Sequence, residues 1–119
     1  MGGPVVREQD VVLRGTLKKQ SRWLRQWRPR WTVLTRQFLV TYMFEGEETQ
    51  GRTPTEFLAL RDCQTVRSAE DDVGQMHAFR VDGPERTFFL VADTKEEKEK
   101  WIGAIGKAMI RGSVMIETD

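Results

Sequence analysis

The hydrophobic pattern of this chain changes period once, near residue 93, and this change limits the folds that it can adopt. Upstream, apolar residues alternate in short runs that are separated by turn signals, which is typical of β-strands. Downstream, apolar residues recur at helical intervals on one stripe. The pattern therefore predicts seven short strands followed by one amphipathic helix. The predicted strands cover residues 11–19, 30–35, 38–44, 55–60, 63–67, 76–81 and 87–92.

Start and stop signals flank the predicted helix. Asp93 and Thr94 are suitable N-caps, and each has a glutamate three residues later, which is the spacing of a capping box. Gly112 is the predicted end, because glycine readily adopts the left-handed conformation that terminates helices. The apolar stripe contains Trp101, Ile102, Ile105, Ala108 and Met109.

This order of elements predicts a mostly β fold. A seven-stranded antiparallel sheet of this length has to curl to bury its apolar face, and its open end needs a cover. We therefore expect a curled sheet, or partly open barrel, that is capped by the C-terminal α-helix. The 119 residues are enough for one domain at 11–111, with a flexible N-terminal tail at 1–10 and a C-terminal tail at 112–119.

A basic segment at residues 18–30 joins the first two predicted strands. The formal net charge is +1, yet residues 1–40 carry nine Lys/Arg and two Asp/Glu (+7), and residues 41–119 carry ten and sixteen (−6). The hairpin would place Lys19 across from Arg28 and Arg30, which share one face of a strand. Three converging cations suit a phosphate-bearing ligand, and Arg22 and Arg25 are further candidate contacts. The alternative is a basic loop that is only solvated.

Trp23 and Leu24 lie near the tip of this loop, between Arg22 and Arg25. An exposed aromatic–aliphatic pair among cations suits the membrane interface, where the ring enters the headgroup layer. We therefore expect Trp23 and Leu24 to anchor the domain on anionic lipid. The alternative is that Trp23 folds back onto the sheet.

Other chemistries find little support in the sequence. The single cysteine, Cys63, excludes an internal disulfide and is expected to fill apolar space in a strand. The single histidine, His77, is expected on a strand, exposed and not catalytic. We predict no enzymatic activity, no metal site and no cofactor. No apolar run is long enough to span a bilayer, no signal peptide is visible, and the acidic residues at 45–48 and 70–72 are expected to be solvated.

Two other kinds of partner fit part of the pattern. A protein–protein interaction module, with only weak and nonspecific binding to anionic lipid, is the main alternative. Basic residues interleaved with tryptophan also suit single-stranded nucleic acid, but we do not expect a nucleic-acid partner.

The two ends of the sequence resemble the pleckstrin homology domain family. Residues 15–19 (Gly-Thr-Leu-Lys-Lys) and 26–34 (Gln-Trp-Arg-Pro-Arg-Trp-Thr-Val-Leu) resemble its opening strands, and residues 93–102, which end in Trp-Ile, resemble its terminal helix. The resemblance covers nearly the whole chain and is closest to short, stand-alone plant and algal members. It implies the same curled sheet and capping helix.

The resemblance also implies a ligand. In phosphoinositide-binding members the matching residues, Lys19, Arg28 and Arg30, hold the headgroup, with Lys19 and Arg30 on the most deeply held phosphate, often the 3-phosphate. Thr41 stands where polyphosphate-selective members place a tyrosine, and Trp23 stands where some carry another arginine. These departures favour a less phosphorylated 3-phosphoinositide. We therefore expect a monomeric, cytoplasmic protein that associates peripherally with membranes, including endosomal ones.

Overall fold

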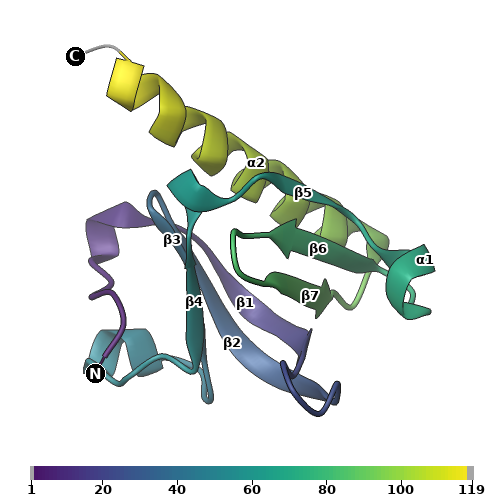
Figure 1. The fold of residues 1–119 in the computed structure, drawn as a ribbon. Coiled ribbons are helices and arrows are strands. Elements are labelled where there is room, and N and C mark those ends of the chain that lie inside the picture. Colours follow the sequence, from purple (N-terminus) through teal and green to yellow (C-terminus); the bar gives the residue numbers. More distant parts are fainter. Residues whose placement is uncertain (1, 118–119) are drawn as a thin grey trace.

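Seven strands form one antiparallel sheet that curls without closing (Figure 1). The computed structural model describes residues 2–117, with the side chains of residues 2–110. Hydrogen-bonded neighbours follow the order β4-β3-β2-β1-β7-β6-β5, so β4 and β5 are the two edges. The sheet confirms the predicted fold class. The strands are β1 (Val11–Gln20), β2 (Trp27–Thr35), β3 (Phe38–Tyr42), β4 (Glu56–Ala59), β5 (Thr65–Ser68), β6 (Ala78–Asp82) and β7 (Thr87–Val91).

The C-terminal helix α2 (Lys95–Glu117) packs against β1, β5, β6 and the short 3-10 helix η3 (Leu60–Asp62), and so covers one end of the curled sheet (Figure 1). Trp101 and Ile105 are fully buried in the main core. A Cβ atom at Gly15 of β1 would lie 3.3 Å from Trp101 Cζ2, so the glycine permits the close approach of the helix. The predicted stripe thus faces the sheet.

The structure confirms the predicted start of α2 but not its predicted end. Thr94 Oγ1 accepts a hydrogen bond from the Glu97 backbone N–H at 3.1 Å, so Thr94 is the N-cap, and Glu97 Oε2 pairs with Lys100 at 3.2 Å. The prediction that Gly112 ends the helix is wrong, because α2 continues to Glu117. Glycine inside a helix costs only about 0.5–1 kcal/mol, so it does not by itself stop one.

A second apolar cluster covers the outer face of the sheet, around Val33, Val40 and Tyr42. The 3-10 helix η2 (Glu47–Gln50) packs beside it and buries Glu48. Glu48 accepts hydrogen bonds from Trp31 Nε1 and from Arg14 Nε, both at 2.7 Å. The prediction of solvated charge at 45–48 is therefore wrong for Glu48, because the turn folds back over the sheet and brings the carboxylate to two half-buried donors.

The segment before β6 also differs from the prediction. Residues 70–73 form a short helix, α1 (Glu70–Val73), in which Glu70 pairs with Lys98 at 2.8 Å and Asp72 with Arg80 at 3.4 Å. Glu70 and Asp72 therefore form ion pairs that the sequence did not predict, whereas Asp71 and Asp72 are exposed, as expected for solvated charge. His77 precedes β6 and has a φ of 61°, which no strand residue adopts. Cys63 lies between η3 and β5, outside any strand, but it packs against the main core as expected.

Candidate functional site

The β1–β2 pairing gathers basic side chains on one face of the sheet. Lys19 is the direct cross-strand partner of Arg28, and Leu17 is the partner of Arg30. Directly paired residues point to the same face, and so do residues two apart in a strand. Lys19, Arg28 and Arg30 therefore share the inner face, near the end of the curled sheet that α2 leaves uncovered. The register confirms the predicted pairing of Lys19 with Arg28.

A pocket of about 540 Å³ opens at this end of the sheet. It lies between the β1–β2 loop, the start of β4, α1 and the start of β7. Of the predicted site residues, Lys19, Arg22 and Arg25 line it, whereas Arg28 and Arg30 do not. The charged residues that line it are Lys19, Arg22, Arg25, Glu56, Asp72 and Arg86.

Lys19 is the most deeply placed cation of the pocket and is only 5% exposed. Its Nζ lies 3.0 Å from Glu56 Oε1 and 4.3 Å from the centre of the Phe88 ring. Burial is the main cause that lowers the pKa of Lys19; Arg86 and Arg30 act in the same direction, and Glu56 opposes them. The ammonium group is therefore desolvated and lies within the field of two guanidinium groups.

Arg86 and Glu56 were missed in the sequence, although both contribute to the pocket. Arg86 Nη1 lies 3.0 Å from Glu56 Oε1, and Arg86 Nη2 donates a hydrogen bond to the Phe57 carbonyl oxygen at 3.3 Å. Arg86 directly follows the turn at 82–85, which the sequence marks as a hairpin. That turn was the available signal, because it indicates that Arg86 lies at one end of the sheet. It does not indicate which end.

The tip of the β1–β2 loop projects into solvent. Trp23 is 81% exposed and Leu24 is 66% exposed, so Trp23 does not fold back onto the sheet. The Arg22 guanidinium lies over the Trp23 ring, 4.8 Å from its centre. The loop is closed by Ser21, whose Oγ accepts a hydrogen bond from the Gln26 backbone N–H at 2.9 Å. The structure thus presents an aromatic and an aliphatic side chain beside cations.

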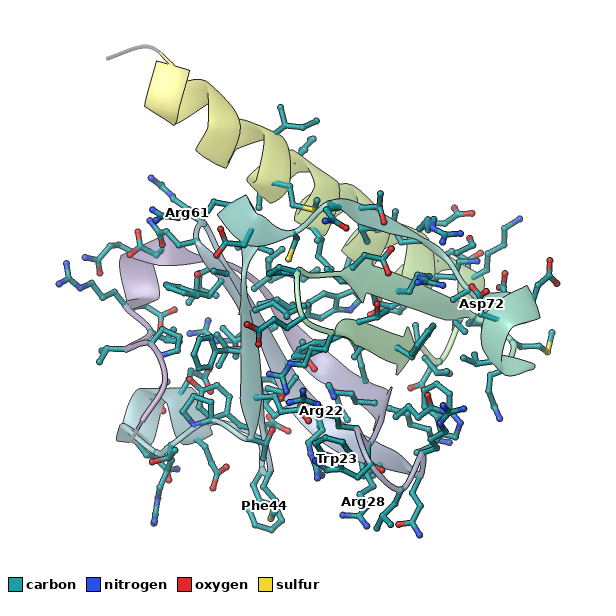
Figure 2. The ribbon with its side chains drawn as sticks, viewed as in Figure 1. Arg22, Trp23, Arg28, Phe44, Arg61 and Asp72 are labelled. Atoms are coloured by element: carbon teal, nitrogen blue, oxygen red, sulfur yellow. The ribbon has the colours of Figure 1, made fainter. Side chains whose placement is uncertain are left out.

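Two further apolar side chains, which sequence reasoning missed, lie at the same end of the molecule. Met43 and Phe44 directly follow β3 and are 52% and 65% exposed. Phe44, Trp23 and Arg28 all project from this end (Figure 2). The sequence did not indicate that Met43 and Phe44 are exposed. Both residues continue the apolar run of β3, so the pattern assigned them to the last two positions of that strand.

The strand β3 separates its side chains between the two faces. Thr41 is buried on the pocket side, where it pairs across the strands with Thr32 and Glu56, and its Oγ1 lies 2.7 Å from Thr55 Oγ1. Tyr42 belongs to the outer cluster, where burial is the main cause that raises its pKa to about 12. Thr41 is therefore the β3 hydroxyl nearest the pocket.

Comparison with known proteins identifies the family. The sequence profile of the PH domain matches residues 11–109. The chain belongs to the PH domain family. It is 37% identical over 100 residues to Pleckstrin homology domain-containing protein 1 of Arabidopsis thaliana. The aligned region covers 83% of this chain and 69% of that protein. The predicted resemblance to short plant PH proteins is thereby confirmed, and PH domains are generally non-catalytic.

Solved PH domains share the fold. The crystal structure of the carboxyl-terminal PH domain of pleckstrin superposes with a TM-score of 0.68 at 29% identity, over 83% of this chain and 97% of that one. The same pleckstrin domain in complex with D-myo-Ins(1,2,3,4,5)P5 gives a TM-score of 0.65 at 27% identity, over 82% and 97% of the two chains. Within the described residues, no helix of this PH domain is long and apolar enough to cross a membrane.

Proposed function

We propose that this PH domain binds phosphoinositides in membranes through the basic pocket at the open end of its sheet. The observation that carries the proposal is the meeting of Lys19 and Arg86 in the buried part of the pocket, each 3.0 Å from Glu56 Oε1, with Arg22 and Arg25 at its mouth. Arg30 lies outside the lining but close enough to lower the pKa of Lys19. Similar pleckstrin domains have been solved with inositol pentakisphosphates, which supports a phosphate-bearing ligand.

Each cation has a distinct role in this proposal. Lys19 and Arg30 hold the deepest phosphate, and Arg28 lies beside them on the same face. Guanidinium groups match phosphate oxygens in pairs, so Arg22 and Arg25 can reorient from solvent onto the outer phosphates.

We further propose a preference for 3-phosphoinositides with few phosphates. Thr41, and not a longer phenol, is the β3 hydroxyl on the pocket side, so one polar contact to an additional phosphate is lacking. Glu56 and Asp72 also line the pocket, and their charge opposes a crowded polyanion. A singly phosphorylated headgroup, as on endosomal membranes, is the ligand that this balance favours.

The apolar side chains at the open end complete a membrane-facing surface. Trp23 and Phe44 project from the end where the headgroup would enter (Figure 2), and their chain neighbours Leu24 and Met43 are also exposed. In this proposal they enter the interface while the arginines remain at the level of the phosphates. The domain would then associate peripherally, with the pocket directed at the lipid.

The decisive experiment is calorimetry with soluble inositol phosphates, together with liposome sedimentation, on the wild type and Arg30→Ala. Loss of one charge-assisted contact, which contributes about 1.5–3 kcal/mol, should weaken binding about 10- to 150-fold. Arg61→Ala is the matched control, because Arg61 is exposed and lies at the other end of the molecule (Figure 2). Its affinity should equal that of the wild type.

Two outcomes would contradict the proposed function. Equal binding by the wild type and Arg30→Ala, or binding by neither, would exclude the pocket as a phosphoinositide site. Sedimentation with every anionic lipid alike, without a response to soluble headgroups, would instead favour the protein-interaction alternative with nonspecific lipid contact. A steep salt dependence without preference among headgroups, combined with binding to oligonucleotides, would favour a nucleic-acid partner.

A further inference from the structure

A carboxylate lies between two of the cations that line the pocket. Glu56 is the first residue of β4 and the cross-strand partner of Thr41, so its side chain lies on the pocket face. A single oxygen, Oε1, lies 3.0 Å from Lys19 Nζ and 3.0 Å from Arg86 Nη1. Two of the cations that could hold a phosphate therefore already share one internal anion.

The surroundings of this oxygen give it no other compensation. Glu56 Oε1 is buried and, within the described residues, accepts no hydrogen bond of good geometry. The Lys19 ammonium and the Arg86 guanidinium, each 3.0 Å away, are therefore the described groups that compensate its charge. Buried charges are tolerated only when they are paired, and like charges brought into contact are costly. A phosphate cannot approach Lys19 and Arg86 without either repelling or replacing this carboxylate.

We propose, on the basis of the proposed function, that Glu56 is an internal counter-anion that a headgroup phosphate has to displace from Lys19 and Arg86. The side chain then sets the affinity of the pocket, because every deep-binding headgroup loses the same amount of free energy on displacing it. A lipid that contacts only Arg22 and Arg25 at the mouth leaves Glu56 in place. Glu56 therefore separates pocket binding from surface binding.

The test uses Glu56→Gln, which keeps the size of the side chain and removes its charge. Calorimetry with soluble inositol 1,3,4,5-tetrakisphosphate and inositol 1,3-bisphosphate should show at least about tenfold tighter binding than the wild type. Sedimentation with vesicles that contain 3-phosphoinositide should show the same gain. Vesicles of phosphatidylserine alone should bind within about twofold of the wild type, because their contacts lie at the mouth of the pocket.

Glu85→Gln is the matched control. Glu85 is exposed, lies outside the pocket lining and directly precedes Arg86, so the substitution changes the net charge by the same amount in the same region. Its affinity for both soluble probes should stay within about twofold of the wild type. An equal gain in Glu85→Gln would mean that overall charge, and not displacement of Glu56, controls the affinity, and would overturn the inference.

The remaining outcomes separate this inference from the proposed function. If the wild type binds the soluble probes and folded Glu56→Gln binds them equally or more weakly, the counter-anion role is wrong and the proposed function stands. If neither protein binds, both are wrong. Should Glu56→Gln fail to fold, NMR of the ¹³C-labelled wild type decides. The Glu56 carboxyl resonance has to move when the probe saturates the pocket, and binding without movement contradicts displacement.

Discussion

At the scale of single residues, Glu48 connects three segments of the outer sheet face. It projects from η2, and its two oxygens accept hydrogen bonds from Arg14 on β1 and from Trp31 on β2. Arg14 also pairs with Glu8 at 2.6 Å, and its hydrogen bonds to Glu8 and Glu48 raise the pKa of the guanidinium. Glu48 thus ties η2 to the sheet, and Arg14 in turn ties Glu8 of the N-terminal segment to it.

Replacing this carboxylate should destabilise the domain. Glu48→Ala leaves the Trp31 N–H and part of the Arg14 charge without partners, which should lower the free energy of unfolding by about 2–3 kcal/mol. Urea denaturation measures the change. Glu45→Ala, at an exposed position of the same turn, should change it by less than about 0.5 kcal/mol. Similar losses in both variants would mean that the Glu48 contacts contribute little.

The sequence could predict only part of the site, and the reason is the distance along the chain. Lys19 and Arg28 are joined by a short loop, so alternation and hairpin geometry were enough to pair them. Glu56 and Arg86 reach Lys19 from other strands. Their approach depends on how the sheet curls, which no local pattern specifies.

At the scale of elements, the β1–β2 loop and the turn after β3 form two apolar corners at one end of the sheet (Figure 2). The loop carries Trp23 and Leu24, and the turn carries Met43 and Phe44. Surface apolar residues are common singly, but two exposed pairs beside a cationic pocket suit a membrane interface. The corners are separate from the pocket lining, so their contribution can be measured separately.

Removing either corner should affect membranes and not soluble headgroups. Trp23→Ala and the double variant Met43→Ser/Phe44→Ser should each weaken liposome sedimentation about fivefold or more, because apolar burial in the bilayer is lost. Calorimetry with soluble inositol phosphates should give wild-type affinities. A parallel loss in both assays would show that these side chains support the pocket structurally.

Periodicity predicted the elements better than their ends. All seven strands and the helix overlap the residues that alternation and helical spacing indicated, and most of them bury apolar side chains in the core. β5 is the weakest case, since Val66 alone is half-buried. The ends differ where tertiary contacts intervene. Met43 and Phe44 leave β3 for the rim, and His77 adopts a left-handed turn in which its N–H donates to Glu70 Oε2. Such contacts with distant residues are absent from any sequence window.

At the scale of the whole molecule, a net charge of +1 conceals a local excess of cations at the open end, where Lys19, Arg22, Arg25 and Arg86 outnumber Glu56 and Asp72 in the pocket lining. The cations of residues 18–30 gather at the open end, whereas Glu48 and Glu70 are engaged in ion pairs elsewhere. Within the open end, Lys19 is buried and Arg22 and Arg25 are exposed. Because salt screens exposed charges far more than buried ones, the two groups should respond differently to ionic strength.

Salt titration should separate these two groups of cations. When NaCl is raised from about 0.1 M to about 0.5 M, the loss of headgroup affinity should be smaller in Arg22→Ala/Arg25→Ala than in the wild type. Lys19→Gln should bind more weakly at every salt concentration, with a slope close to that of the wild type. Identical slopes in the three proteins would place the exposed arginines outside the binding reaction.

The direction of α2 has a practical consequence for such measurements. Its C-terminal end lies on the far side of the molecule from the β1–β2 loop (Figure 1). A fluorophore or a surface tether attached at that end would therefore leave the pocket and the apolar corners accessible. An immobilised domain would present its open end to vesicles flowing past, and an attached dye would report arrival at a bilayer without touching it.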